Sequence, residues 1–228
     1  MSVEHFDLTG QRAIVLRTDN PAGAAIADAF EEAGALVSRI GAVEANNVAD
    51  EVTHAAKQLG GLNILACAPD LFVAKPVTDI TGGDLGPVMM VNFASQLFAI
   101  QAALPFIREH ERGNIVLLTS VLGERGLPNT SIYSAAQGAV VNLVRALAQE
   151  LAPEGISINA IELGWMDWMD DRIDKTDEQA SRAVRFTMLK RPGKAEDIGP
   201  LAVWLAGDAV GFVTGQIFPV DGGLTQHL

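Results

Sequence analysis

The sequence predicts an α/β fold in which a parallel sheet is covered by helices on both faces. Three observations support this prediction. Short β-rich runs alternate with helical patterns along the chain. The β-rich runs are mostly apolar, which is typical of strands buried on both sides. No internal repeat and no linker rich in Pro, Gly or Ser divides the chain, so residues 1–228 are expected to form a single domain.

The elements follow one another in a regular order. Six strands are expected at residues 13–17, 35–39, 62–66, 114–119, 157–161 and 216–219. Helices are expected at residues 21–33, 48–59, 88–107, 133–151 and 196–205. In such sheets the crossovers are right-handed, and ligands bind at the carboxyl ends of the strands, near the point where strand order reverses. The loops after Arg17, Ala66, Thr119 and Ile161 are therefore the first places to look for a site.

One helical stretch needs to be tested as a membrane span. Residues 85–107 contain no charged side chain. Asn92, Ser95 and Gln96 interrupt the stretch, so it is expected to be a helix buried by the sheet or by a partner subunit. A membrane partner is not expected.

Composition excludes several classes of function. The net charge is −12 and the pI is about 4.6, so neither nucleic acid nor an anionic membrane is an expected partner. Cys67 is the one cysteine, which rules out an internal disulfide and makes a cytoplasmic location the default. The first ten residues have no apolar core of a signal peptide. The four histidines lack metal-ligand spacing, so no metal site is predicted.

Three segments carry a recognisable pattern. They are GNIVLLTSVLG at residues 113–123, a long segment starting YSAAQG at residues 133–161, and VTGQIFPVDGG at residues 213–223. In this order, and with the spacing from Ser120 to Tyr133, they resemble the short-chain dehydrogenase/reductase family. The resemblance implies a Rossmann-like doubly wound sheet and NAD- or NADP-dependent alcohol or carbonyl chemistry on a small-molecule substrate. It also implies a homodimer or homotetramer.

The resemblance places four residues in the catalytic positions. Tyr133 would exchange a proton with the substrate oxygen, Ser120 would hold that oxygen, and Asn92 would support a water relay. Asn92 is equally well explained as a satisfied polar residue. Gln137 stands where the family has a lysine that lowers the pKa of the tyrosine and binds the nicotinamide ribose.

Gln137 carries no charge, although it lies on the same helical face as Tyr133 and can still hydrogen-bond a ribose. Without another cation, the pKa of Tyr133 is expected near its ordinary value of about 10, which would make Tyr133 a proton donor and a poor base. Arg17 and Arg125 lie in loops at the same edge of the sheet, and either could replace the lysine.

The phosphate-binding loop also departs from the family pattern. T-G-x-x-x-G-x-G becomes TDNPAGAA at residues 18–25, and N-N-A-G becomes CAPD at residues 67–70. Asp19 should repel phosphate, and Pro21 has no N–H to offer. Asn20 followed by Pro21 reads as a helix cap. The positions that would line the cofactor groove are Thr18, Asn20, Gly23, Ala66, Ala68 and Gly164. NAD(P) binding is expected to be impaired.

A deletion affects the same groove. Between the second strand and the helix at Val48, only residues 40–47 remain where the family has a helix and a further strand. The missing strand would be an edge strand, so six strands are expected. Gly41 takes the place of the acidic residue that discriminates between riboses.

Other candidates lie near the end of the fifth strand. Glu162 is interpreted as a satisfied surface residue in preference to a site carboxylate. Trp165 and Trp168 would cover a substrate or pack a lid or interface. The acidic run at Asp167, Asp170, Asp171 and Asp174 is expected to be a solvated helix face. Cys67 is expected to be a core residue.

Three functions remain open. The first is a family-type oxidoreductase that acts through the Ser/Tyr pair with impaired NAD(P) binding. The second is a redox-neutral enzyme that uses the same pair on an epoxide, halohydrin or hydroxy-carbonyl compound. The third is a non-catalytic subunit that associates with a related chain.

Overall fold

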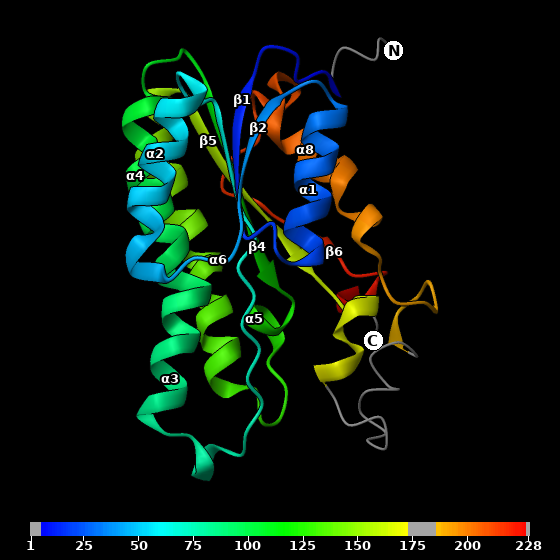
Figure 1. Ribbon diagram of the computed structural model, residues 1–228. Helices are drawn as coiled ribbons and strands as arrows, with labels where there is room; N and C mark the ends of the chain where they lie inside the picture. The colour runs from blue at the N-terminus through cyan, green and yellow to red at the C-terminus, as the bar shows by residue number, and fades with distance from the viewer. Residues whose placement is uncertain (1–5, 173–185, 227–228) are drawn as a thin grey trace.

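The computed structural model describes residues 6–172 and 186–226 and confirms the predicted α/β sheet (Figure 1). Six parallel strands lie in the order β2-β1-β3-β4-β5-β6. The strands are β1 (Arg12–Leu16), β2 (Leu36–Ile40), β3 (Ile64–Cys67), β4 (Gly113–Ser120), β5 (Ile156–Leu163) and β6 (Ile217–Val220). Each strand begins and ends within about two residues of its predicted bounds, because the apolar runs coincide with the paired backbone.

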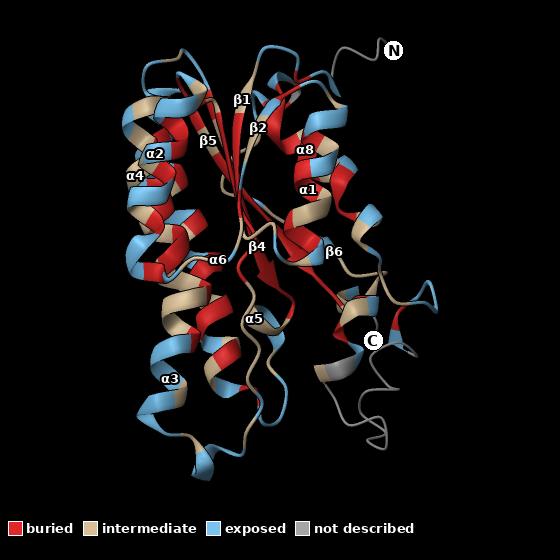
Figure 2. Cartoon of the chain, in the orientation of Figure 1, coloured by how far each residue is buried: buried red, intermediate tan, exposed pale blue. Residues whose placement is uncertain are grey.

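Helices cover both faces of the sheet. They are α1 (Pro21–Glu32), α2 (Val48–Leu59), α3 (Gly82–Met89), α4 (Ser95–Ile107), α5 (Leu122–Arg125), α6 (Ser131–Leu151) and α8 (Gly199–Ala206). Figure 1 shows α1 and α8 on one side of the sheet, and α2, α4 and α6 on the other. Each side has its own buried apolar cluster, one around Phe30 and Ile26, the other around Ile100 and Val144 (Figure 2). Burial of these two clusters holds the three layers together.

The helix predicted to begin at Val88 is longer than expected and is interrupted. α3 begins at Gly82. Thr81, which precedes the helix, and Asp84 in its first turn form a capping box. A π-helical turn at Met90–Ala94 then joins α3 to α4. Such a turn inserts an extra residue that hydrophobic periodicity does not reveal, which is why the sequence predicted one regular helix.

By length and composition alone, Gly82–Ile107 is one helical stretch that could cross a membrane, and 39% of its most apolar window is buried inside the structure. Core helices of soluble proteins meet the same criterion. Here the polar residues Asn92, Ser95 and Gln96 are buried within the protein, and α4 packs on the sheet. This arrangement fits the core helix that the sequence predicted.

Strand order reverses between β1 and β3, which are neighbours in the sheet although β2 separates them in the chain. β2 is the edge strand, and residues 41–47 lead from it directly to α2. The six-stranded sheet with β2 at its edge agrees with the prediction from the sequence. The crevice between the loops after β1 and β3 is where a doubly wound sheet normally binds its ligand.

Candidate active site

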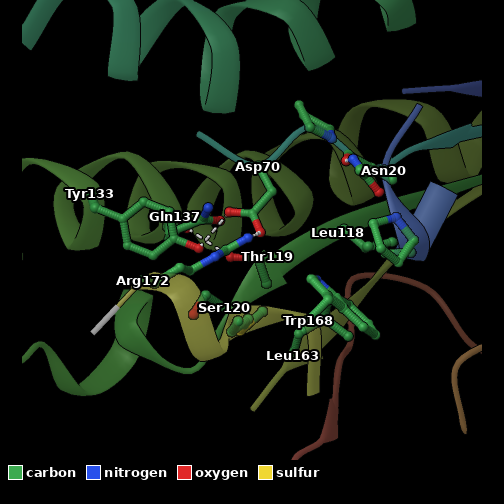
Figure 3. A pocket seen from close by; sticks show the side chains of 15 residues that line it. Asn20, Asp70, Leu118, Thr119, Ser120, Tyr133, Gln137, Leu163, Trp168 and Arg172 are labelled. Carbon is green, nitrogen blue, oxygen red and sulfur yellow. Dashed lines mark hydrogen bonds and ion pairs between the residues drawn. The ribbon is translucent and has the colours of Figure 1, made fainter. Parts of the chain in front are cut away.

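A small pocket lies at the carboxyl edge of the sheet (Figure 3). It brings together five predicted residues, Asn20, Ala68, Ser120, Tyr133 and Gln137, with the unpredicted pair Asp70 and Arg172. Its apolar walls come from Leu118, Leu163, Trp168 and Met169. The solvent-accessible volume is about 70 Å³, which is enough for a few waters or a small ligand.

The Ser120–Tyr133 pair meets in this pocket. Ser120 is the last residue of β4 and Tyr133 lies in the first turn of α6, with exposed fractions of 8% and 2%. The Thr119 hydroxyl donates to the Gln137 carbonyl at 3.1 Å, which ties α6 to the end of β4. Packing of α6 against the strand end therefore positions the two hydroxyl groups.

Tyr133 has an acidic partner that the sequence did not predict. Its hydroxyl donates to Asp70 Oδ1 at 2.9 Å, and Arg172 Nη2 donates to Asp70 Oδ2 at 2.6 Å. The Phe72 ring meets the Tyr133 ring edge-on, with centroids 5.0 Å apart, and the Arg172 guanidinium lies 5.5 Å from the Phe72 centroid. Figure 3 shows the Asp70 carboxylate, the Arg172 guanidinium and the Tyr133 hydroxyl meeting at one place in the pocket.

These contacts change the titration of Tyr133. Burial raises the pKa of Tyr133 well above its ordinary value, and the charge and hydrogen bond of Asp70 raise it further. Arg172 and the Ser120 hydroxyl act in the opposite direction. The expectation of an ordinary pKa is wrong, because it considered only the missing lysine and neither burial nor a neighbouring carboxylate.

Neither of the two cations suggested by the sequence reaches the tyrosine. Arg17 forms a bidentate pair with Asp19, at 2.8 and 2.9 Å. Arg125 donates to the carbonyls of Leu224 and Thr225 near the C-terminus. Arg172 is the cation beside Tyr133, and it lies within the acidic run that was interpreted as a solvated face.

Gln137 and Asn92 are both buried, with different surroundings. The Gln137 side chain is 2% exposed, and its Oε1 has no hydrogen-bond partner among the described residues. Asn92 lies in the π-helical turn, where its Oδ1 accepts from Leu71 N at 2.8 Å and its Nδ2 donates to Leu71 O at 2.9 Å. Asn92 thus holds the loop that carries Asp70.

Asn20 spans the crevice where strand order reverses. Its Oδ1 accepts from Gly23 N at 2.9 Å and caps α1, while its Nδ2 donates to Ala68 O at 2.7 Å. One side chain therefore occupies a free amide of the helix start and joins the loops after β1 and β3. The helix cap predicted from Asn20 and Pro21 is confirmed.

The other predicted groove residues are held by backbone contacts. Thr18 N donates to Ile40 O at 3.0 Å. A Cβ on Gly23 would lie 2.2 Å from Arg17 O, and one on Gly164 would lie 2.6 Å from Asp221 Cα. Both glycines therefore allow close packing of the chain. Ala66 and Ala68 are fully buried.

The start of α1 does not fit the pyrophosphate of a dinucleotide. Hydrogen bonds from Arg17 hold the pKa of the Asp19 carboxyl below its ordinary value, so Asp19 is anionic at neutral pH. Asn20 already uses the Gly23 amide, and Pro21 has no amide hydrogen. An anionic ligand would find a charged carboxylate and few free N–H donors here.

Glu162 is buried, which makes its interpretation as a satisfied surface residue wrong. It lies in β5 between β4 and β6, is 3% exposed, and its Oε1 has no hydrogen-bond partner among the described residues. Burial, and then the charges of Glu124 and Asp221, raise the pKa of Glu162 to about 7. A single glutamate in an apolar strand gives no sequence signal of such burial.

The remaining candidates are placed as follows. Cys67 is fully buried, as predicted, and burial raises the pKa of its thiol. Trp165 and Trp168 are half-buried against the apolar cluster of α1 and α8. Asp167 and Asp170 are exposed, whereas Asp174 lies outside the described residues. Within residues 6–172 and 186–226, no group of three His, Cys, Asp or Glu could hold a metal ion.

Comparison with known proteins identifies the family. A family model described as enoyl-(acyl carrier protein) reductase matches residues 3–225. This chain belongs to the short-chain dehydrogenase/reductase family. It is 33% identical to L-2,3-butanediol dehydrogenase of Corynebacterium glutamicum over 192 residues, covering 79% of this chain and 74% of that protein. Among similar curated relatives, the aligned part spans 52% to 97% of the relative's own length.

Solved structures of the same family share the whole fold. A Sinorhizobium meliloti protein assigned as a short-chain alcohol dehydrogenase has a TM-score of 0.92 and 29% identity, covering 98% of this chain and 99% of its own. A metagenomic blue fluorescent protein, solved in complex with NADPH, has a TM-score of 0.87 and 27% identity, covering 96% and 99%. The family predicted from the sequence motifs is confirmed, and with it a place among oxidoreductases.

Proposed function

We propose that this member of the family acts on the oxygen atom of a small carbonyl or hydroxyl compound, with Tyr133 donating a proton to that oxygen and Ser120 holding it. The observation that carries the proposal is the shared buried pocket of the Ser120 and Tyr133 hydroxyls. A tyrosine with a raised pKa keeps its proton at neutral pH and can act as a general acid. The carbonyl-to-alcohol direction is therefore favoured.

The pocket supports a small substrate with an apolar carbon skeleton. Its accessible volume of about 70 Å³ is far below that of a typical ligand cleft. Leu118, Leu163 and Trp168 provide apolar contacts around the polar end formed by the two hydroxyls. Specificity would come from fit against these walls, since the charges of Asp70 and Arg172 are already paired.

The relatives support NAD(P)-dependent hydride chemistry, whereas the start of α1 supports impaired binding of that cofactor. We therefore assign only the proton transfer and the orientation of the oxygen to residues of this chain. A redox-neutral reaction on a hydroxy-carbonyl compound is the second candidate. The bridge from Asn20 to Ala68 favours it, because the bridge occupies the crevice that a dinucleotide would need.

An oligomer is part of the proposal. The α3–α4 stretch carries apolar side chains that the single chain covers only partly, including Met89, Phe93 and Leu97. A second copy or a related chain packed on this surface would remove them from water. We propose a homodimer or homotetramer.

Turnover of small aldehydes, ketones and hydroxy-ketones, measured with and without NADH or NADPH, tests the chemistry. Tyr133→Phe should lower any activity by roughly 10²- to 10⁴-fold, because it removes the acid. Gln149→Ala, on the exposed face of α6, is the matched control and should leave activity unchanged. Equal activity of wild type and Tyr133→Phe would contradict the proposal.

Cofactor binding separates the two candidates. Under hydride chemistry, NADH or NADPH should protect the protein against thermal unfolding by mass action. Under the redox-neutral reading, it should not. If neither activity nor protection is found, and Tyr133→Phe assembles normally, the chain is a non-catalytic subunit.

A further inference from the structure

Two opposite charges meet at the tyrosine that the family uses for catalysis. In the part of the chain that the structure describes, Asp70 and Arg172 are the charged groups that act on Tyr133, and the Ser120 hydroxyl is the other polar group. Asp70 accepts a hydrogen bond from the tyrosine at 2.9 Å and one from the arginine at 2.6 Å, and the three groups lie side by side (Figure 3). Its two oxygens are thus used by two different donors.

The surrounding contacts fix Asp70 in this position. Asn92 binds both backbone groups of Leu71, the next residue along the chain. Phe72, one residue further, contacts both the Tyr133 ring and the Arg172 guanidinium. The side chains of Asp70 and Arg172 are each only 19% exposed, so their charges are screened by solvent less than those of a surface pair.

We propose that Asp70 and Arg172 together replace the missing lysine of this site as a proton relay and charge pair for Tyr133. This inference rests on the proposed function, since it concerns the same substrate oxygen. When the substrate hydroxyl is deprotonated to an alkoxide, its O–H bond breaks and the proton moves to the Tyr133 oxygen. The Tyr133 O–H bond breaks at the same time, and that proton moves to Asp70 Oδ1.

The relay is balanced without any further reactant. The substrate oxygen keeps the electron pair of its O–H bond, and Asp70 becomes neutral. Arg172 then remains as an unpaired cation close to the newly formed alkoxide, where it stabilises the negative charge. In the reverse direction, Asp70 returns its proton to Tyr133, which protonates the substrate oxygen. No phenolate has to exist in a buried site.

In this scheme Tyr133 exchanges the proton with the substrate oxygen, Asp70 acts through Tyr133, and Arg172 faces both Asp70 and the alkoxide. Gln137 supplies no charge to the relay. Removing the charge of Asp70 and removing that of Arg172 should shift the pKa of Tyr133 in opposite directions, because a carboxylate raises the pKa of a phenol and a guanidinium lowers it. A role limited to holding the fold together would not produce opposite shifts.

Tyr133 is the single tyrosine of the chain, so a spectrophotometric phenol titration reports on it alone. Asp70→Asn should lower the pKa of Tyr133, and Arg172→Met should raise it. Arg172→Lys should restore a pKa close to that of the wild type. Asp79→Asn, an exposed change nine residues from Asp70, is the matched control and should have no effect.

Circular dichroism at each pH shows whether the fold survives. If alkaline unfolding precedes ionisation, the variants are compared by NMR at a pH at which each of them is folded. Should Asp70→Asn fail to fold, the proposal is tested by the Tyr133 titrations of Arg172→Met and Arg172→Lys. At neutral pH, the NMR signal of ¹³C-labelled tyrosine should also move in Arg172→Met and return in Arg172→Lys.

Equal titrations of wild type, Asp70→Asn and Arg172→Met would overturn the relay, as would shifts of the same sign. This result does not depend on finding a substrate, so it is separate from the failure of the proposed function. If a substrate is found, the pH profile of kcat should change in Asp70→Asn and be unchanged in Asp79→Asn.

Discussion

The loop at the start of α1 and the junction of β4 with α6 lie at the same edge of one sheet, yet they have diverged differently. At the β4–α6 junction, Ser120 and Tyr133 still share a buried pocket. At α1, Asn20 caps the helix with its own side chain and ties the loop to Ala68. Asp19 and Arg17 place a paired charge beside it. The part of the site suited to proton transfer is kept, and the part suited to phosphate is filled.

The difference shows that a crevice at a topological switch point is available to ligands only while its backbone donors are free. In α1 those donors are used within the chain, which stabilises the loop but leaves little for an anion. At Tyr133 a cation is present although Gln137 carries no charge, because Arg172 and Asp70 both lie beside the phenol. The two regions thus differ in what their side chains leave open to a ligand.

The largest effect is expected from closing the space where α1 meets β1. A Cβ on Gly23 would lie 2.2 Å from Arg17 O, which is backbone and cannot move alone. Gly23→Ala should therefore lower the free energy of unfolding by about 3 kcal/mol and the Tm by roughly 6–12 °C. Gly86→Ala, in α3 with no neighbouring atom within 4 Å, should instead stabilise the protein slightly.

Thermal unfolding of the two variants measures this difference. If Gly23→Ala is as stable as Gly86→Ala, the α1 loop has room to move. In that case the contrast between a closed α1 loop and an open catalytic pocket would no longer hold.

The second effect is a dependence of stability on pH, caused by Glu162 near the end of β5. The pKa of Glu162 is about 7 in the folded chain, against 4.5 for an ordinary glutamate. A carboxyl with a raised pKa favours folding in its neutral form, so the contribution of Glu162 to stability is fully present below pH 4.5 and is lost as the pH rises to about 7. Glu162→Gln is neutral at every pH and should be more stable than wild type at pH 8, by about 2 kcal/mol.

The comparison to make is the Tm difference between Glu162→Gln and wild type at pH 8 and at pH 5. The difference should be clearly larger at pH 8. Glu150→Gln, exposed on α6, should give the same small difference at both. A pH-independent gain for Glu162→Gln would mean that Glu162 has a partner outside the described residues.

Much of this fold could be predicted from the sequence, because each strand is a short apolar run and each run lies between helical patterns. Asn20 followed by Pro21 identified the start of α1 by local chemistry alone, and the Ser120–Tyr133 spacing predicted two hydroxyls that the structure places in one pocket. The π-helical turn at Met90–Ala94 was missed, because its residues have the same composition as those of a regular helix.

The site could be predicted only in part, because its charges come from distant segments. Asp70 and Arg172 are 102 residues apart in the chain, and no periodicity relates them. Arg172 follows several acidic residues, which made a solvated surface the simpler interpretation. The burial of Glu162 has the same cause, since exposure depends on what neighbouring elements cover.

The smallest effect is expected from removing the side chains that fill the loop at the start of α1. This change tests the comparison of the two regions most directly. The double variant Asp19→Gly, Asn20→Gly removes the carboxylate, frees the Gly23 amide and breaks the bridge to Ala68. NADPH should then bind about tenfold more tightly than to wild type, a gain of about 1.4 kcal/mol. Stability should fall by about 1 kcal/mol, because one cap and one bridging hydrogen bond are lost.

Fluorescence titration with NADPH measures the affinity. The double variant Asn47→Gly, Asp50→Gly is the matched control, because it removes the same residue types at the start of α2, away from the crevice. It should leave NADPH binding unchanged. If wild type already binds NADPH as tightly as the opened variant, the α1 side chains are not the barrier, and both regions would have kept their original roles.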